Sequence, residues 1–141
     1  MRDNLPRRGI LAQRLKDGQP RAVEEAIQFL NDDSYSHGSG YVKEECWHAI
    51  SDAPLSVRQR ERLQHAALKY LDRRISREFW YMCRAMAQLA EGSFREAVDQ
   101  FIATRTQAAR KRATLLRAYL DGIEKGEQTR LAFIREARSA R

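Results

Sequence analysis

Apolar residues recur at intervals of three and four along most of the chain, and they never alternate with polar residues for long. This spacing predicts amphipathic α-helices, because a helix turns once every 3.6 residues. No segment has the period-two pattern or the β-branched enrichment of a strand. The main apolar stripes are Val23, Ala26, Ile27 and Leu30; Val42, Cys46, Ala49 and Ile50; Leu63, Ala67, Tyr70 and Leu71; Phe79, Met82, Cys83, Met86 and Leu89; Phe94, Ala97, Val98, Phe101 and Ile102; and Leu115, Leu116, Tyr119, Leu120 and Ile123.

Helix-breaking residues separate these stripes at regular intervals. They predict turns at tips near residues 18, 53, 92 and 126. At the third tip, Gly92 is expected to end one helix and Ser93 to begin the next, with Glu96 completing a capping box. The tips lie about 34 to 39 residues apart, which is typical of stacked helix pairs.

The segment 92–101, GSFREAVDQF, resembles the second-helix half of a tetratricopeptide repeat. Gly92 stands at the turn, Phe94, Ala97 and Phe101 stand at the packing positions, and Gly126 follows one period later. The resemblance implies a right-handed α-α superhelix of about three to four helical hairpins, similar to armadillo, HEAT and tetratricopeptide proteins. The alternative is an irregular helical bundle. Either arrangement makes residues 1–141 a single all-helical domain.

Composition narrows the class of protein. A length of 141 residues suits one domain. The mean hydropathy of -0.69 and the 32% of charged residues exclude a membrane span. Residues 1–8 lack the apolar core of a secretory signal, and we therefore expect a cytoplasmic protein. The two cysteines, Cys46 and Cys83, lie on apolar stripes and are expected to be reduced and structural.

The net charge of +7 is concentrated in the last third of the chain. Residues 101–141 hold ten basic and four acidic residues. The stretch from 104 to 120 holds five basic residues and no acidic one, so these five are candidate partner-binding residues: Arg105, Arg110, Lys111, Arg112 and Arg117. Their partner would be an acidic peptide or the phosphates of a nucleic acid.

Arg105 and Arg112 pose a specific problem. If the helix that starts near Phe94 ran unbroken to Ile123, both arginines would lie within its apolar stripe. An unpaired buried arginine costs several kcal/mol. Either the helix breaks between residues 104 and 109, or the two arginines line an internal groove for an anionic partner.

Two aromatic residues are further candidates for partner binding. Phe79 belongs to an apolar stripe, and a helix rotates by about 100° per residue. At least one of its neighbours, Trp80 and Tyr81, must therefore turn away from that stripe. A half-exposed aromatic side chain is a common interface anchor. The alternative is that both residues pack against adjacent helices.

Catalytic and metal-binding patterns are scarce. Glu45 with His48, and Glu61 with His65, share helix faces, but neither pair has a complement that would complete a ligand set. His37 lies in the glycine- and serine-rich segment 31–40, which we predict to be a loop and which is as well explained as a plain connector. We expect no catalytic residue, no metal and no cofactor.

These observations favour a non-enzymatic helical-repeat module, a scaffold or adaptor that binds a partner protein or peptide. The alternative is a nucleic-acid-binding protein that places its basic C-terminal third, 101–141, on phosphates. Self-association is also open, because an array this short has uncapped terminal hairpins. No membrane partner is expected.

Overall fold

The computed structural model of the chain describes residues 9–32, 39–73, 78–89 and 91–121. Every regular element in these ranges is an α-helix. The helices are α1 (Ile10–Lys16), α2 (Pro20–Asp32), α3 (Ser39–Ile50), α4 (Val57–Leu71), α5 (Phe79–Leu89), α6 (Gly92–Thr104) and α7 (Gln107–Leu120). The prediction of an all-α protein is confirmed. His37 and the turn near residue 126 lie outside the described residues.

The predicted apolar stripes form the core. In α5, all five residues of the stripe, Phe79, Met82, Cys83, Met86 and Leu89, are buried. They belong to one continuous hydrophobic cluster that all seven helices share. Burial of these side chains supplies the main driving force for packing the helices.

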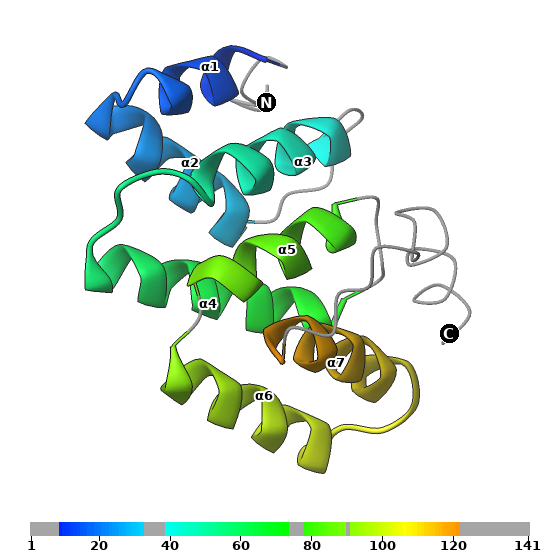
Figure 1. Cartoon of the computed structure of the whole chain (residues 1–141). Coiled ribbons are helices and arrows are strands. Elements are labelled where there is room, and N and C mark those ends of the chain that lie inside the picture. Colours follow the sequence, from blue (N-terminus) through cyan, green and yellow to red (C-terminus); the bar gives the residue numbers. More distant parts are fainter. Residues whose placement is uncertain (1–8, 33–38, 74–77, 90, 122–141) are drawn as a thin grey trace.

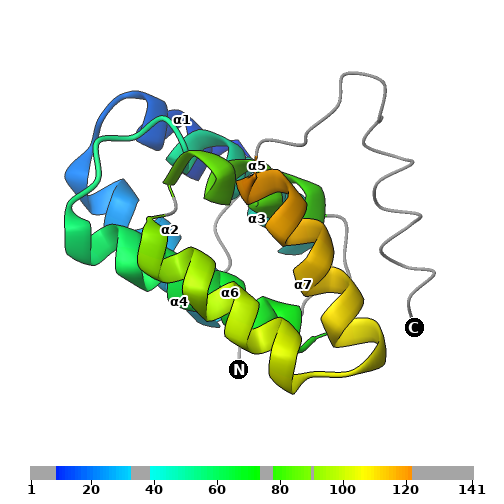
Figure 2. The same ribbon diagram turned by 60° about the horizontal axis from the view of Figure 1, so that its bottom comes forward.

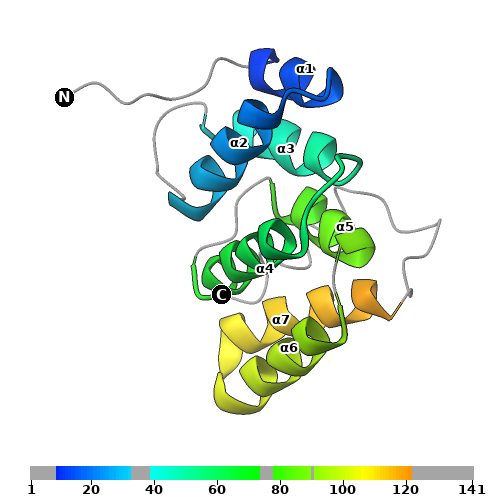
Figure 3. The same ribbon diagram turned by 90° about the vertical axis from the view of Figure 1, so that its left-hand side faces the viewer.

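The helices form two adjoining layers. One layer contains α1, α3, α5 and α7, each of which packs against the next. The other layer contains α2 and α4, which pack against each other. Helix α6 packs against α7 at the end of the stack. Figure 1 and Figure 3 show the resulting stack, which runs from α1 at one end to α6 and α7 at the other.

The first two described turns have clear local causes. Gly18, between α1 and α2, has a φ of 76°, a left-handed conformation that glycine adopts without a Cβ clash. Ser56 caps α4: its side chain accepts a hydrogen bond from the Gln59 backbone N–H, and the Gln59 side chain accepts one from the Ser56 N–H. This capping box fixes where α4 begins.

The capping box expected at Ser93 was a wrong prediction. The N-cap of α6 is Glu91, which makes no side-chain capping bond, and Gly92 is the first helical residue. Gly92 does not adopt the positive φ of a helix-ending glycine. Ser93 therefore lies inside the first turn of α6, where its hydroxyl is not in the N-cap position.

The long helix considered for residues 94–123 is interrupted at Arg105 and Thr106. Arg105 has extended backbone angles, and Gln107 has a φ of 53° where α7 begins. Figure 2 shows that α7 runs back alongside α6 after this break. Of the two alternatives for Arg105 and Arg112, the structure shows the first, a helix that breaks between residues 104 and 109.

Both cysteines are free and buried. Burial raises the pKa of the Cys46 thiol to about 12, and it also raises the pKa of Cys83. At neutral pH both side chains are uncharged thiols within the core, and neither is activated as a nucleophile.

Candidate functional site

Arg105, the first predicted partner-binding residue of the basic stretch, pairs with Asp72. Its Nε and Nη2 atoms donate to the two carboxylate oxygens of Asp72 at 3.0 and 3.1 Å. The guanidinium also lies over the Phe101 ring, 4.4 Å from the centroid. Arg105 therefore connects the end of α6 to the end of α4 within the protein.

Arg112 is buried, with 8% of its surface exposed. Its Nε donates to the backbone oxygen of Leu71 at 2.9 Å. That carbonyl belongs to the last turn of α4, where backbone oxygens lack helical partners and a positive charge is favourable. Burial lowers the pKa of Arg112, and the nearby Asp72 carboxylate partly opposes this effect. The residue holds α7 against the end of α4.

Arg117 links α6 to α7. Its Nε lies 2.7 Å from Asp99 Oδ1, and its Nη1 donates to Asp121 Oδ1. Arg95 joins the same cluster, with its Nη1 2.6 Å from Asp121 Oδ1. The hydrogen bond from Arg95, followed by that from Arg117, holds the pKa of Asp121 below its usual value.

Arg110 and Lys111 are placed differently. Both are exposed on α7, and neither side chain forms a hydrogen bond or ion pair with a residue in the described ranges. The break after α6 thus divides the five basic candidates into three that bond within the protein and two that face solvent.

The aromatic candidates on α5 are half-buried and pack against the core. Trp80 lies edge-on to Tyr81, with ring centroids 4.9 Å apart, and the Arg84 guanidinium lies over the Trp80 ring at 4.8 Å. Tyr81 lies edge-on to His48 of α3, at 5.9 Å. Tyr81 therefore faces the neighbouring helix α3.

Two adjoining pockets meet at His48. The α3–α5 pocket, of about 160 Å³, lies between His48 and Tyr81 and is also lined by Trp47, Ser51, Asp52, Arg84, Ala85 and Gln88. The α1–α3 pocket, of about 220 Å³, is lined by His48 together with Gly9, Ala12, Gln13, Lys16, Glu45 and Ala49. We call this pair of pockets the His48 groove. It crosses three successive helices of one layer.

The polar groups of the His48 groove are mixed in charge. Lys16 and Glu45 line the α1–α3 pocket, and Asp52 and Arg84 line the α3–α5 pocket. Glu45 also positions the first helix, because its Oε1 accepts a 2.6 Å hydrogen bond from the Gly9 backbone N–H. Such a surface offers hydrogen bonds of both kinds, which suits the backbone and polar side chains of a peptide.

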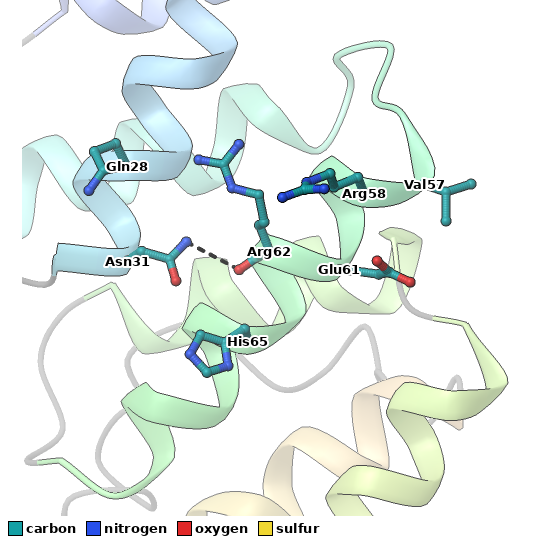
Figure 4. Close-up of a pocket in the computed structure, with 7 residues that line it drawn as sticks. All are labelled: Gln28, Asn31, Val57, Arg58, Glu61, Arg62 and His65. Atoms are coloured by element: carbon teal, nitrogen blue, oxygen red, sulfur yellow. Dashed lines mark hydrogen bonds between the residues drawn. The ribbon is translucent and has the colours of Figure 1, made fainter.

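A second hollow, the α2–α4 groove, lies on the other layer and measures about 630 Å³. Figure 4 shows its lining residues, which include Glu61 and His65, the pair that the sequence places on one helix face. In the figure the Glu61 carboxylate and the His65 ring point in different directions. The pair does not converge on one point as metal ligands would.

Sequence analysis missed one buried ion pair. Lys43 Nζ of α3 lies 3.9 Å from Glu78 Oε2 at the start of α5, and both side chains are at most 3% exposed. The available signal was the position of Lys43, which lies on the same helix face as Trp47 and Ile50. Charge at that position argued for an exposed residue, and the partner Glu78 is 35 positions away.

In the described part of the chain, no three His, Cys, Asp or Glu side chains gather closely enough to hold a metal ion. Nor is any described helix both long and apolar enough to cross a bilayer. Comparisons of the chain with protein-family models, with curated proteins and with solved structures find no match.

Proposed function

We propose that the chain is a non-enzymatic interaction module, an α-α superhelix of the kind that the tetratricopeptide resemblance implies, which holds a segment of a partner protein in the His48 groove. The observation that carries the proposal is that His48 lines two pockets at once, one toward α1 and one toward α5. A single peptide segment lying across the helix layer can therefore contact three helices. Stacked helix pairs bind extended or helical peptides in this way.

The lining of the groove supports a peptide ligand. It contains the aromatic candidate Tyr81 and one amide side chain in each pocket, Gln13 and Gln88. The exposed large apolar side chains in the described ranges are Ile10, Tyr41 and Val57, which lie on three different helices. Recognition by this surface therefore depends on polar and aromatic contacts more than on an apolar patch.

Selection from a random peptide library on the immobilised protein tests the proposal, followed by affinity measurements with variants. Gln13→Arg and Gln88→Arg place a larger, charged side chain in either pocket. Gln100→Arg adds the same side chain to an exposed position of α6 that lines neither pocket. We expect both groove variants to weaken the selected peptide and the control to bind it like the wild type.

A peptide that binds all three variants equally would refute the His48 groove as the site. The peptide segment belongs to another protein or to a second copy of this chain. Light scattering separates these two cases. If the groove binds a second copy of the chain, the wild type is an oligomer, and both Gln13→Arg and Gln88→Arg should have the molar mass of a monomer.

A further inference from the structure

We infer that the α2–α4 groove binds an acidic side chain of a partner peptide between Arg58 and Arg62 of α4. This inference goes beyond the proposed function, since it concerns the other helix layer and shares no lining residue with the His48 groove. The groove is lined by Gln28 and Asn31 of α2 and by Val57, Arg58, Glu61, Arg62 and His65 of α4.

Hydrogen bonds join α2 and α4, the two helices that line the groove. The Asn31 amide nitrogen donates to the backbone oxygens of Ile27 and Arg62, at 3.1 and 3.2 Å. Lys69 Nζ donates to the Asn31 backbone oxygen at 2.6 Å. Figure 4 shows the bond between Asn31 and Arg62 among the lining residues. These bonds hold the backbones of α2 and α4 at a fixed separation beside the arginines.

The acid nearest to these cations is already engaged. Glu24 accepts from Arg62 Nη1 through one oxygen, at 2.7 Å, and from Gln59 Nε2 through the other, at 3.0 Å. The hydrogen bond from Arg62, and then that from Gln59, lowers the pKa of Glu24. Both Glu24 oxygens are thus occupied, and Arg62 keeps further N–H groups that this pair does not use.

Arg58 supplies the charge that remains. It is exposed, and its side chain forms no hydrogen bond or close ion pair with any residue in the described ranges, although its charge adds to that of Arg62 in lowering the pKa of Glu24. In Figure 4 its guanidinium is directed toward that of Arg62, whereas the Glu61 carboxylate is directed away from both. Two neighbouring guanidinium groups match a carboxylate, which accepts paired N–H donors.

The surroundings favour a peptide over a nucleic acid. A phosphate backbone lying along the groove would bring several negative charges past Glu61, which lines it, and like charges repel. A single acidic side chain brings only one negative charge to the arginines, and Glu24 keeps its bond to Arg62 Nη1. Val57, which is 61% exposed, offers an apolar contact for the rest of the peptide.

Fluorescence anisotropy with a labelled peptide of repeated Ala-Ala-Glu-Ala units tests the inference, and its Ala-Ala-Gln-Ala counterpart is the peptide control. We expect the Glu peptide to bind more tightly than the Gln peptide and Arg58→Gln to weaken the Glu peptide about fivefold. Arg58→Lys should retain part of the affinity. The matched control is Arg110→Gln, which removes an exposed arginine from α7 and should leave binding unchanged.

Each of the other outcomes overturns the inference. Equal binding of the two peptides, or no binding of the Glu peptide, would show that the groove does not recognise a carboxylate. An equal loss with Arg110→Gln places the contact elsewhere. Tighter binding of a labelled oligothymidylate, lost in Arg58→Gln, assigns the groove to nucleic acid. Circular dichroism of Arg58→Gln confirms that the variant is folded, and Gln13→Arg and Gln88→Arg test the His48 groove separately.

Discussion

Arg105 and Asp72 form a two-point ion pair, with Nε and Nη2 of the arginine 3.0 and 3.1 Å from the two carboxylate oxygens. The arginine directly follows α6 and the aspartate directly follows α4. All three buried or paired arginines of the basic stretch, Arg105, Arg112 and Arg117, bond to a carboxylate or a backbone carbonyl of the protein itself. The density of positive charge in this stretch therefore has a structural use, which is to attach α6 and α7 to each other and to α4.

Replacing Arg112 tests this structural use. Arg112→Met keeps the length of the side chain but removes the hydrogen bond to the Leu71 oxygen, so we expect a loss of about 2 kcal/mol in the free energy of unfolding. Urea denaturation measures the change. Lys111→Met, at the exposed neighbouring position, is the control and should have an effect near zero. Equal losses in the two variants would contradict the assignment of Arg112 to the interior.

The capping assignments are tested by a second pair of variants. Ser56→Ala removes the capping box of α4 and is expected to cost about 1 kcal/mol. Ser93→Ala is expected to change stability little, because Ser93 is not at the N-cap of α6. Thermal melting of both variants checks the difference. A larger loss for Ser93→Ala would show that α6 begins where the sequence pattern places it.

Stability is expected to fall in acid. Arg62 holds the pKa of Glu24 below its ordinary value of 4.5, and Arg95 holds that of Asp121 below 3.8. The unfolded chain therefore takes up these protons at a higher pH than the folded chain does. The stabilisation is complete above about pH 5 and is lost as the pH falls through the folded-state values.

Melting temperatures measured across this range check the expectation. The double variant Glu24→Gln, Asp121→Asn should melt lower near neutral pH and should show a shallower fall in acid. The control is Glu96→Gln, which neutralises one exposed acid of α6 and should leave the acid fall unchanged. A double variant whose acid fall is as steep as that of the wild type would contradict the role of the two carboxylates.

The helices were predictable because their apolar stripes reflect local geometry. A stripe such as Phe79, Met82 and Met86 needs only the 3.6-residue period to be recognised, and burial follows from it. The turn at Gly92 was less predictable. Serine followed three residues later by glutamate occurs inside a helix as well as at its start, so the pattern alone does not locate the N-cap.

The candidate site was less predictable than the helices, because its contacts join distant residues. The partner of Arg105 is 33 positions away, and that of Arg112 is 41 positions away. No periodicity encodes such pairs. Likewise, the place of His48 between two pockets depends on how α1, α3 and α5 stack. A run of basic residues does not show which of them bond within the chain and which face solvent.

The nucleic-acid alternative makes its own prediction. With Arg105, Arg112 and Arg117 engaged within the protein, the exposed cations of α7 are Arg110 and Lys111. If they contact phosphates, replacing both by Gln should reduce the slope of log affinity against log salt concentration by about two units. Titration of a labelled oligonucleotide over a range of salt concentrations measures the slope. An unchanged slope would contradict phosphate contacts by these two residues.

The most direct test of the central claim is amide chemical-shift mapping of the labelled protein with a peptide selected from a random library. Binding in the His48 groove predicts the largest shift changes near Gln13, His48 and Gln88, on three different helices. Changes confined to α7 around Arg110, or to α4 around Arg58, would contradict that claim.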